Sequence, residues 1–361
     1  MLLLACAWSL GPASLLPGAE ALGRPTRDLF DHLALLDAWS LSAPQQAFPD
    51  GGRLFPPDLT GMALAAPLLA LGLPRAMAWN WMLLLQLWLA SAAAWALGRR
   101  YGAGLVAGIA YGLSPYLLGQ AMSGEAETVA AWPLPAMALA LERAADTWRG
   151  RAAGSPVPAL VVAGLLGAAA ALGAWYHGAF AGLWMAGWLL LRAWTPQRRF
   201  VGRALLAPAV LGLAIAPAAA LYAWILGAPD QLFRGPAMAD YLDRFPRSLT
   251  TMVTDPSAFF GPPAAGAGHV DALGLVALGL ALLGLVLRPA GRERARWWWG
   301  ALVVALVLAM GPVLHWQGAP VWPWMPYRLL AEEDRDEVRA LLQLHLGPPA
   351  LQVEEGWLWR L

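Results

Sequence analysis

The chain is dominated by long apolar stretches that contain almost no charged residues. An α-helix needs about 20 mostly apolar residues to cross a bilayer, because unpaired backbone groups are too costly in lipid. About nine stretches approach this length, at roughly 2–17, 76–98, 103–121, 128–146, 157–175, 178–194, 204–226, 272–288 and 297–314. We therefore predict an all-α fold, a polytopic bundle of about nine transmembrane helices.

The composition excludes most other classes of protein. Hydrophobic residues make up 59% of the 361 positions and charged residues only 13%, whereas soluble domains have about 45–50% and about 25%. The net charge of +1 gives no attraction for nucleic acid, so membrane lipid is the expected partner. The single cysteine, Cys6, excludes an intrachain disulfide and a cysteine-based zinc site.

Four arginine clusters fall on alternate loops of the predicted bundle. They are Arg99 and Arg100; Arg143, Arg149 and Arg151; Arg192, Arg198, Arg199 and Arg203; and Arg288, Arg292, Arg294 and Arg296. Loops rich in arginine face the cytoplasm. We therefore place these four loops on the cytoplasmic side and the acidic loops on the exterior side.

Two exterior loops are long, at about 18–60 and 227–271. Loops of more than about 12–15 residues are usually functional or disordered, so we expect any chemistry on the exterior face. The apolar segment at 61–73 is too short to span a bilayer and predicts a re-entrant or interfacial half-helix. We treat residues 1–330 as one transmembrane domain and the hydrophilic residues 331–361 as a C-terminal tail.

The first exterior loop contains a candidate acid–base pair. Asp28 and His32 are four residues apart, which places them on one helical face, and Asp31 is their neighbour. A carboxylate beside an imidazole can act as a general base or bind a divalent ion. The alternative is an ordinary solvated helix face.

The next exterior loop adds two carboxylates, Glu125 and Glu127. They either complete an oxygen-rich metal site with Asp28 or Asp31, or cap the helix that starts near Thr128. His177 lies in a tight exterior turn, where a structural role is the alternative to a functional one.

Tryptophan and arginine supply further candidates. Tryptophans such as Trp79 gather at predicted span ends, which is typical of an interfacial belt. Trp39 and Trp175 face the exterior and could stack on a sugar or an isoprenoid. Exterior arginines such as Arg24 and Arg244 are suited to bind phosphate.

Several stretches, taken in order, resemble the GT-C superfamily of membrane glycosyltransferases, within it a bacterial branch that includes YfhO-like and family-39-like proteins. The matching stretches are Asp28-x-x-x-His32, the half-helix at Leu59–Pro74, Ser114-Pro115-Tyr116, the "WLPL"-type start at Ala130–Pro135, Ala174–His177 and the "FF-P" loop at Phe259–Pro262. The likeness covers about 20–330. The chain departs from the family at Gly124–Glu127, where His and Asn are usual, and in its hydrophilic end, so we expect a chain truncated relative to the family.

The resemblance implies inverting transfer of a sugar from a polyprenyl-phosphate donor to an unidentified acceptor, on the non-cytoplasmic face of a bacterial inner membrane. Asp28 would be the general base, and His32 would orient it or help bind Mg or Mn. Asp31, Glu125 and Glu127 would be the metal ligands. The substrate contacts would be Arg24, Arg244, Trp39, Trp175 and His177.

Two other interpretations stay open. One is a non-catalytic membrane protein of the same fold, either a remnant or an assembly subunit. The other is a transporter or flippase for lipid-linked sugars. Transporters place ionisable groups near the bilayer midplane, whereas Gln86 is the main polar interruption within the predicted spans. This argues against the coupled transport of ions.

Overall fold

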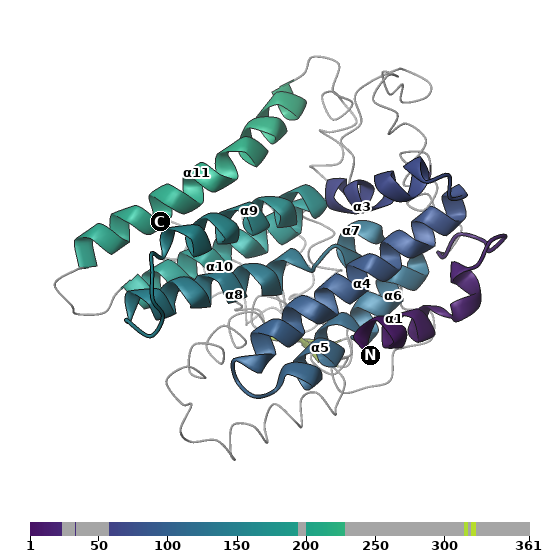
Figure 1. Ribbon diagram of the computed structural model, residues 1–361, viewed down its shortest axis with the longest axis horizontal. Helices are drawn as coiled ribbons and strands as arrows, with labels where there is room; N and C mark the ends of the chain where they lie inside the picture. Colours follow the sequence, from purple (N-terminus) through teal and green to yellow (C-terminus); the bar gives the residue numbers. More distant parts are fainter. Residues whose placement is uncertain (24–32, 34–57, 194–199, 228–313, 317–318, 323–361) are drawn as a thin grey trace, which may run out of the picture. The chain divides into compact units, whose positions relative to one another are not determined.

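The computed structural model describes residues 1–23, 33, 58–193, 200–227, 314–316 and 319–322 (Figure 1). The chain divides into two units, Met1–Leu232 and Phe233–Leu361. The described elements of the first unit are all helical: α1 Leu2–Leu10, the 3₁₀ turn η1 Pro12–Leu15, α3 Leu59–Ala70, α4 Arg75–Arg99, α5 Gly104–Gly112, α6 Pro115–Ser123, α7 Ala126–Val129, α8 Pro133–Trp148, α9 Val157–Gly173, α10 Trp175–Ala193 and α11 Phe200–Gly227. This agrees with the predicted helical bundle.

Helix α4 confirms a long apolar helix where the sequence predicts a span at 76–98. It has 25 residues and a mean hydropathy of 1.5, and at about 1.5 Å per residue it is longer than the roughly 30 Å hydrocarbon core. Within the described ranges it is the one helix both long and apolar enough to cross a membrane. Helix α3 confirms a short apolar helix where the sequence predicts a half-helix. The total of nine spans stays a prediction.

Three predicted spans are interrupted in the structure. The helix expected over 2–17 ends at Leu10, because Gly11 has a φ of 86° and Pro12 starts η1. The helix expected over 103–121 divides into α5 and α6. Ser114 is extended ahead of Pro115, and its Oγ accepts the Leu117 N–H at 3.2 Å, so it caps a new helix. The helix expected over 128–146 is likewise divided between α7 and α8.

Helices α9, α10 and α11 overlap the spans predicted at 157–175, 178–194 and 204–226. The last two predicted spans, at 272–288 and at most of 297–314, lie outside the described residues, as do the tail at 331–361 and most of both long exterior loops. In the second unit, β1 (Leu314–Trp316) pairs antiparallel with β2 (Ala319–Trp322), and His315 lies opposite Pro320. The all-α prediction does not include this strand pair.

Glycines on one face of α5 let it pack closely against α4. Gly104, Gly108 and Gly112 recur every four residues and are all buried. A Cβ on Gly108 would lie 2.9 Å from the carbonyl oxygen of Ser91, and one on Gly112 would overlap the Ser91 side chain. Small residues at this spacing are typical of close contacts between membrane helices.

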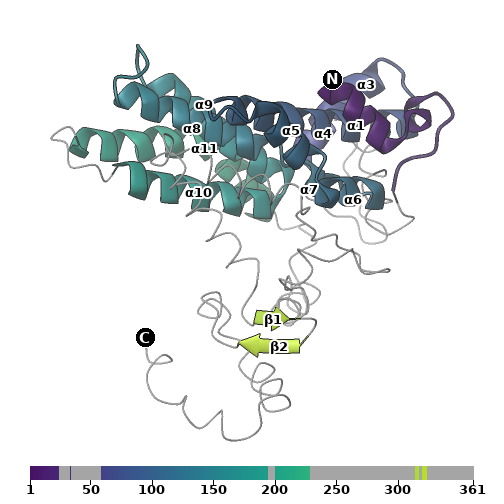
Figure 2. The ribbon, with the colours of Figure 1, turned by 90° about the horizontal axis from the view of Figure 1, so that it is seen from below.

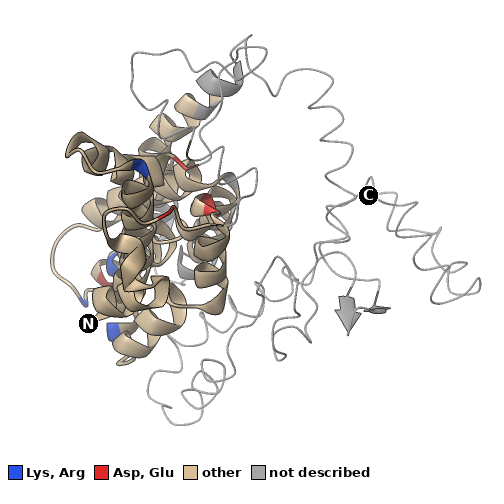
Figure 3. Ribbon diagram, turned by 90° about the vertical axis from the view of Figure 1, so that its right-hand side faces the viewer, with Lys and Arg blue, Asp and Glu red and all other residues tan. Residues whose placement is uncertain are grey.

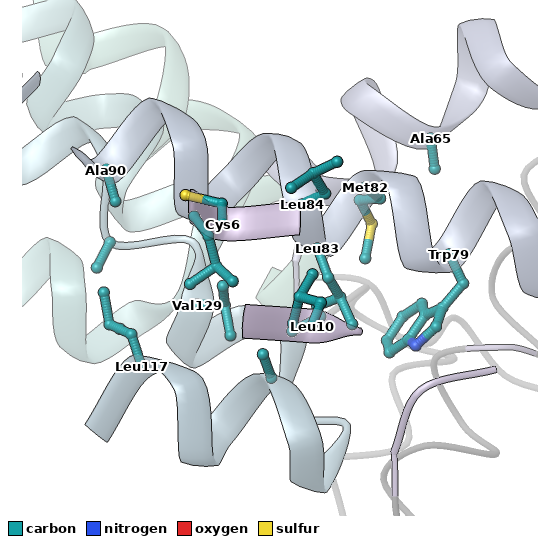
Figure 4. Close-up of a cluster of buried hydrophobic side chains, with 14 of the residues drawn as sticks. Cys6, Leu10, Ala65, Trp79, Met82, Leu83, Leu84, Ala90, Leu117 and Val129 are labelled. Atoms are coloured by element: carbon teal, nitrogen blue, oxygen red, sulfur yellow. The ribbon is translucent and has the colours of Figure 1, made fainter. Parts of the chain in front are cut away.

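The apolar core of the first unit surrounds the first two thirds of α4. Figure 4 shows Leu83 of α4 beside Leu10 of α1, and Val129 of α7 beside Cys6 of α1. Trp79 belongs to this core and is 0% exposed. Trp79 is therefore not a residue of an interfacial tryptophan belt, contrary to the prediction for span ends.

The start of α4 holds the N-terminal segment in place. The buried side-chain amide of Asn80 accepts a hydrogen bond from the backbone N–H of Leu22 at 2.7 Å, and it donates to the carbonyl oxygens of Ser14 and Glu20. The indole N–H of Trp79 donates to the Leu22 carbonyl oxygen at 2.7 Å. These bonds fix the backbone at the start of the predicted first exterior loop.

A second group of helices in the first unit packs around α9, which contacts α8, α10 and α11 (Figures 1 and 2). Charged residues occupy only small stretches of these ribbons (Figure 3). Few polar side chains are buried inside the described part of the bundle, and those that are buried are candidates for a functional site.

Candidate functional site

The structure describes only part of the predicted site. Six of the candidates lie outside the described residues: Arg24, Asp28, Asp31, His32, Trp39 and Arg244. The side chains of Glu125, Glu127 and His177 are described, whereas Trp175 is placed only as the first residue of α10. The site can therefore be built upward from these three side chains and from the residues around them.

The two glutamates sit at a sharp turn between α6 and α7. Gly124 ends α6 with a φ of 90°, a left-handed conformation that glycine adopts without strain. Glu125 occupies the N-cap position of α7 and Glu127 its first turn. The side chain of Glu125 makes no capping hydrogen bond, although both carboxylates suit the positive end of a helix. The turn thus holds two acids within three residues of each other.

The start of α10 meets this acidic turn. The hydroxyl groups of Tyr176 and Thr128 share a hydrogen bond of 2.6 Å. The rings of Tyr176 and His177 meet edge to face, with centroids 4.8 Å apart. The charges of Glu125 and Glu127 both act on Tyr176, and the charge of Glu127 also acts on His177. The structure therefore brings together three predicted site residues, Glu125, Glu127 and His177.

His177 is a buried and neutral histidine. It lies just before the predicted span at 178–194 and is 5% exposed. Burial lowers its pKa to about 4, and the charge of Glu127 opposes this shift only in part. Its Nδ1 atom is buried and has no hydrogen-bond partner within the part of the chain that the structure describes. A neutral imidazole of this kind is suited to one hydrogen bond with a ligand rather than to ion pairing.

The predicted Mg or Mn site is only partly described. Asp31 lies outside the described residues, whereas Glu125 and Glu127 are close to one tyrosine. Within the described ranges, no group of three or more His, Cys, Asp or Glu side chains is arranged to hold a metal ion. Dependence on a metal stays a prediction.

A buried carboxylate, Asp58, is a candidate that the site prediction missed. One of its oxygens caps α3, accepting the N–H of Gly61 at 2.6 Å and the hydroxyl of Thr60 at 2.9 Å. The other oxygen accepts the Nε2 hydrogen bond of Gln86 at 2.7 Å. Both Asp58 and Gln86 are 0% exposed. A side chain on Gly61 would overlap this contact, so glycine is required there.

The depth of Asp58 differs from the prediction. The sequence places it at the end of an exterior loop, but its partner Gln86 lies near the middle of Arg75–Arg99. At about 1.5 Å per residue, Gln86 is about 17 Å from the start of α4 and about 20 Å from its end. The Asp58 carboxylate is therefore level with the middle of α4. Two features of the sequence could have pointed to this contact. Asp58 and Thr60 stand just before an apolar segment, and Gln86 is a polar residue inside a predicted span.

The Asp58 group and the acidic turn meet around Gly173, the last residue of α9. A Cβ on Gly173 would lie 2.7 Å from the hydroxyl of Thr60 and 3.2 Å from the Cβ of Ala130. Thr60 follows Asp58 by two residues, and Ala130 follows Glu127 by three. Tyr176 comes three residues after Gly173. The N-terminal ends of α3 and α10 and the C-terminal end of α7 thus meet around Gly173. We call this meeting point the junction.

The comparisons with known proteins add no relative. No protein-family model, no curated protein and no solved structure matches this chain.

Proposed function

We propose that this chain is a multi-pass membrane glycosyltransferase that moves a sugar from a polyprenyl-phosphate donor to an acceptor on the non-cytoplasmic face. The observation that carries the proposal is the convergence of Glu127 and His177 with Asp58 at one junction among apolar helices. The GT-C resemblance supports it, because three of the matched stretches, Leu59–Pro74, Ala130–Pro135 and Ala174–His177, each contribute a residue to this junction.

Membrane insertion is supported by the length of α4 and by apolar side chains that face outward from the helices. Exposed apolar residues include Leu105, Val106 and Ile109 on α5, Val162 and Leu165 on α9, Phe180 and Leu183 on α10, and Leu213 on α11. In water such surfaces would favour aggregation. A surrounding lipid phase would cover them.

The chemistry assigned to the site follows the resemblance. The acceptor hydroxyl attacks the anomeric carbon while its proton passes to the carboxylate of Asp28, and the bond from that carbon to the lipid phosphate breaks. Neutral His177 contributes a hydrogen bond to the substrate. Arg24 and Arg244 balance the charge of the departing phosphate. Mg or Mn, if bound by Asp31, Glu125 and Glu127, would also neutralise that charge.

The test compares two aspartates of the first exterior loop. Membranes from cells that express the wild-type protein, which contain the cell's own acceptors, are incubated with polyprenyl-phosphate sugars, and loss of the donor is followed. Asp28→Asn should lower the rate by about 10²- to 10⁴-fold, the usual contribution of general acid–base catalysis. Asp37→Asn, nine residues further along, is the matched control and should keep most of the activity. A wild-type protein that is inert with every donor would instead favour the non-catalytic interpretation.

A transporter of lipid-linked sugars is the second candidate, and one observation favours it. The Asp58–Gln86 contact lies level with the middle of α4, beside the short helix α3. Transporters commonly build sites from short or broken helices near the bilayer midplane. Uptake of a labelled lipid-linked sugar into proteoliposomes, lost in Asp58→Asn and unaffected by Asp28→Asn, would select this function over the transferase.

A further inference from the structure

One end of the first unit carries exposed arginines from two separate segments of the chain. Arg100 at the end of α4 forms an ion pair with Asp146 of α8, which brings the ends of these helices together. The backbone N–H of Arg151 bonds the Asp146 carbonyl oxygen at 2.9 Å, so the turn after α8 lies at the same level. We define the arginine rim as the four exposed arginines at this end: Arg99, Arg143, Arg149 and Arg151.

The exposed charge of this end is entirely positive within the part of the chain that the structure describes. Glu142 is buried, and Asp146 is half-buried in its pair with Arg100. The guanidinium of Arg99 lies over the ring of Trp95, 4.8 Å from its centroid, and Trp95 is 36% exposed. Arginine binds phosphate oxygens through two parallel hydrogen bonds, which favours a phosphate-bearing partner.

Apolar surface begins directly beside the arginine rim. Helix α5 starts four residues after Arg100 and exposes Leu105 and Val106 in its first turn. Helix α9 follows Arg151 and exposes Val162 and Leu165. A polyanion dissolved in water would bind the arginines but leave this apolar surface exposed. A bilayer covers both the arginine rim and the apolar surface, because its phosphates lie next to its hydrocarbon chains.

We propose that the arginine rim binds the headgroups of anionic phospholipids in the leaflet around the C-terminal end of α4. The inference rests on the membrane part of the proposed function and is independent of the sugar chemistry. Each arginine near an anionic membrane surface strengthens the attraction by about fivefold. Salt screens this attraction, because the Debye length falls from about 10 Å at 0.1 M to about 3 Å at 1 M.

The experiment titrates detergent-solubilised protein with phosphatidylglycerol or phosphatidylcholine of the same acyl chains, and native mass spectrometry counts the bound lipids. Wild-type protein should prefer phosphatidylglycerol, and 0.5 M salt in a parallel fluorescence titration should weaken that preference. The variant R149Q/R151Q changes two exposed side chains of one turn. It should lose phosphatidylglycerol affinity by about fivefold per arginine and keep its affinity for phosphatidylcholine.

The matched control is Arg75→Gln, which removes an exposed arginine from the opposite end of α4. It should leave the preference unchanged. Equal affinity of the wild type for both lipids, or an unchanged preference in R149Q/R151Q, would overturn the proposal. A wild-type protein absent from the membrane fraction of expressing cells would instead refute the membrane part of the proposed function.

Discussion

The Nε2 atom of Gln86 donates a hydrogen bond of 2.7 Å to Oδ2 of Asp58, across a junction that is closed to solvent. This bond joins the first turn of α3 to the middle of α4. It places an acidic side chain inside a bundle whose predicted spans are otherwise almost free of charge. The contact gives the first prediction.

The Asp58–Gln86 bond should make a measurable contribution to stability. A buried hydrogen bond contributes about 0.5–1.5 kcal/mol, and up to about 3 kcal/mol when one partner is charged. A double-mutant cycle with Asp58→Leu, Gln86→Met and the double variant, followed by thermal unfolding in detergent, should give a coupling free energy in this range. A coupling close to zero would show that the two side chains do not support each other.

The close packing of α5 on α4 should depend on Gly112. A methyl group there would overlap the side chain of Ser91, and overpacking of this kind costs about 1–3 kcal/mol. Gly112→Ala should therefore lower the unfolding temperature. Gly212→Ala is the matched control, because a Cβ at Gly212 meets nothing within 4 Å and alanine suits a helix interior better than glycine. Equal effects of the two variants would argue against this contact.

The buried state of His177 should make stability depend on pH. Its pKa falls from 6.5 in the unfolded chain to about 4 in the folded protein. The folded state is therefore fully stable above pH 6.5 and loses stability as the pH falls toward 4, because the unfolded chain binds the proton more tightly. The loss should reach about 3 kcal/mol at pH 4. His177→Gln should flatten the profile of unfolding temperature between pH 7 and pH 4.5, and a profile as steep as that of the wild type would contradict the assignment.

The orientation of the chain should follow its arginines. The ion pair of Arg100 with Asp146 already holds the first two arginine clusters at one end of the first unit. In a Cys6→Ala background, cysteines at Arg99, Arg149, Arg199 and Arg292 should resist a membrane-impermeant thiol reagent in intact cells. Cysteines at Asp50 and Asp240 should react. Labelling of the cysteine at Arg199 from outside would reverse the predicted orientation.

The amino-acid sequence was enough to predict the helical class of the first unit and the position of the 25-residue apolar helix α4. Both follow from local properties, because a run of apolar residues either is or is not long enough to cross a bilayer. The long apolar helix at 76–98 and the short helix near 61–73 were predictable for this reason. The sequence predicted only that Glu127 and His177 lie on the same, exterior side of the membrane. It did not predict that the two residues lie close together.

The positions at which the helices break, and the pairs of polar groups that come into contact, became visible only in the folded chain. The hydropathy pattern did not reveal the helix ends at Gly11 and Ser114. One or two helix-breaking residues barely change the mean hydropathy of a long apolar segment. The depth of Asp58 depends on its bond to Gln86, 28 residues away, and that bond requires Gly61 to leave space. Contacts of this kind depend on how helices pack, and packing is set by the shapes of side chains that are distant in sequence.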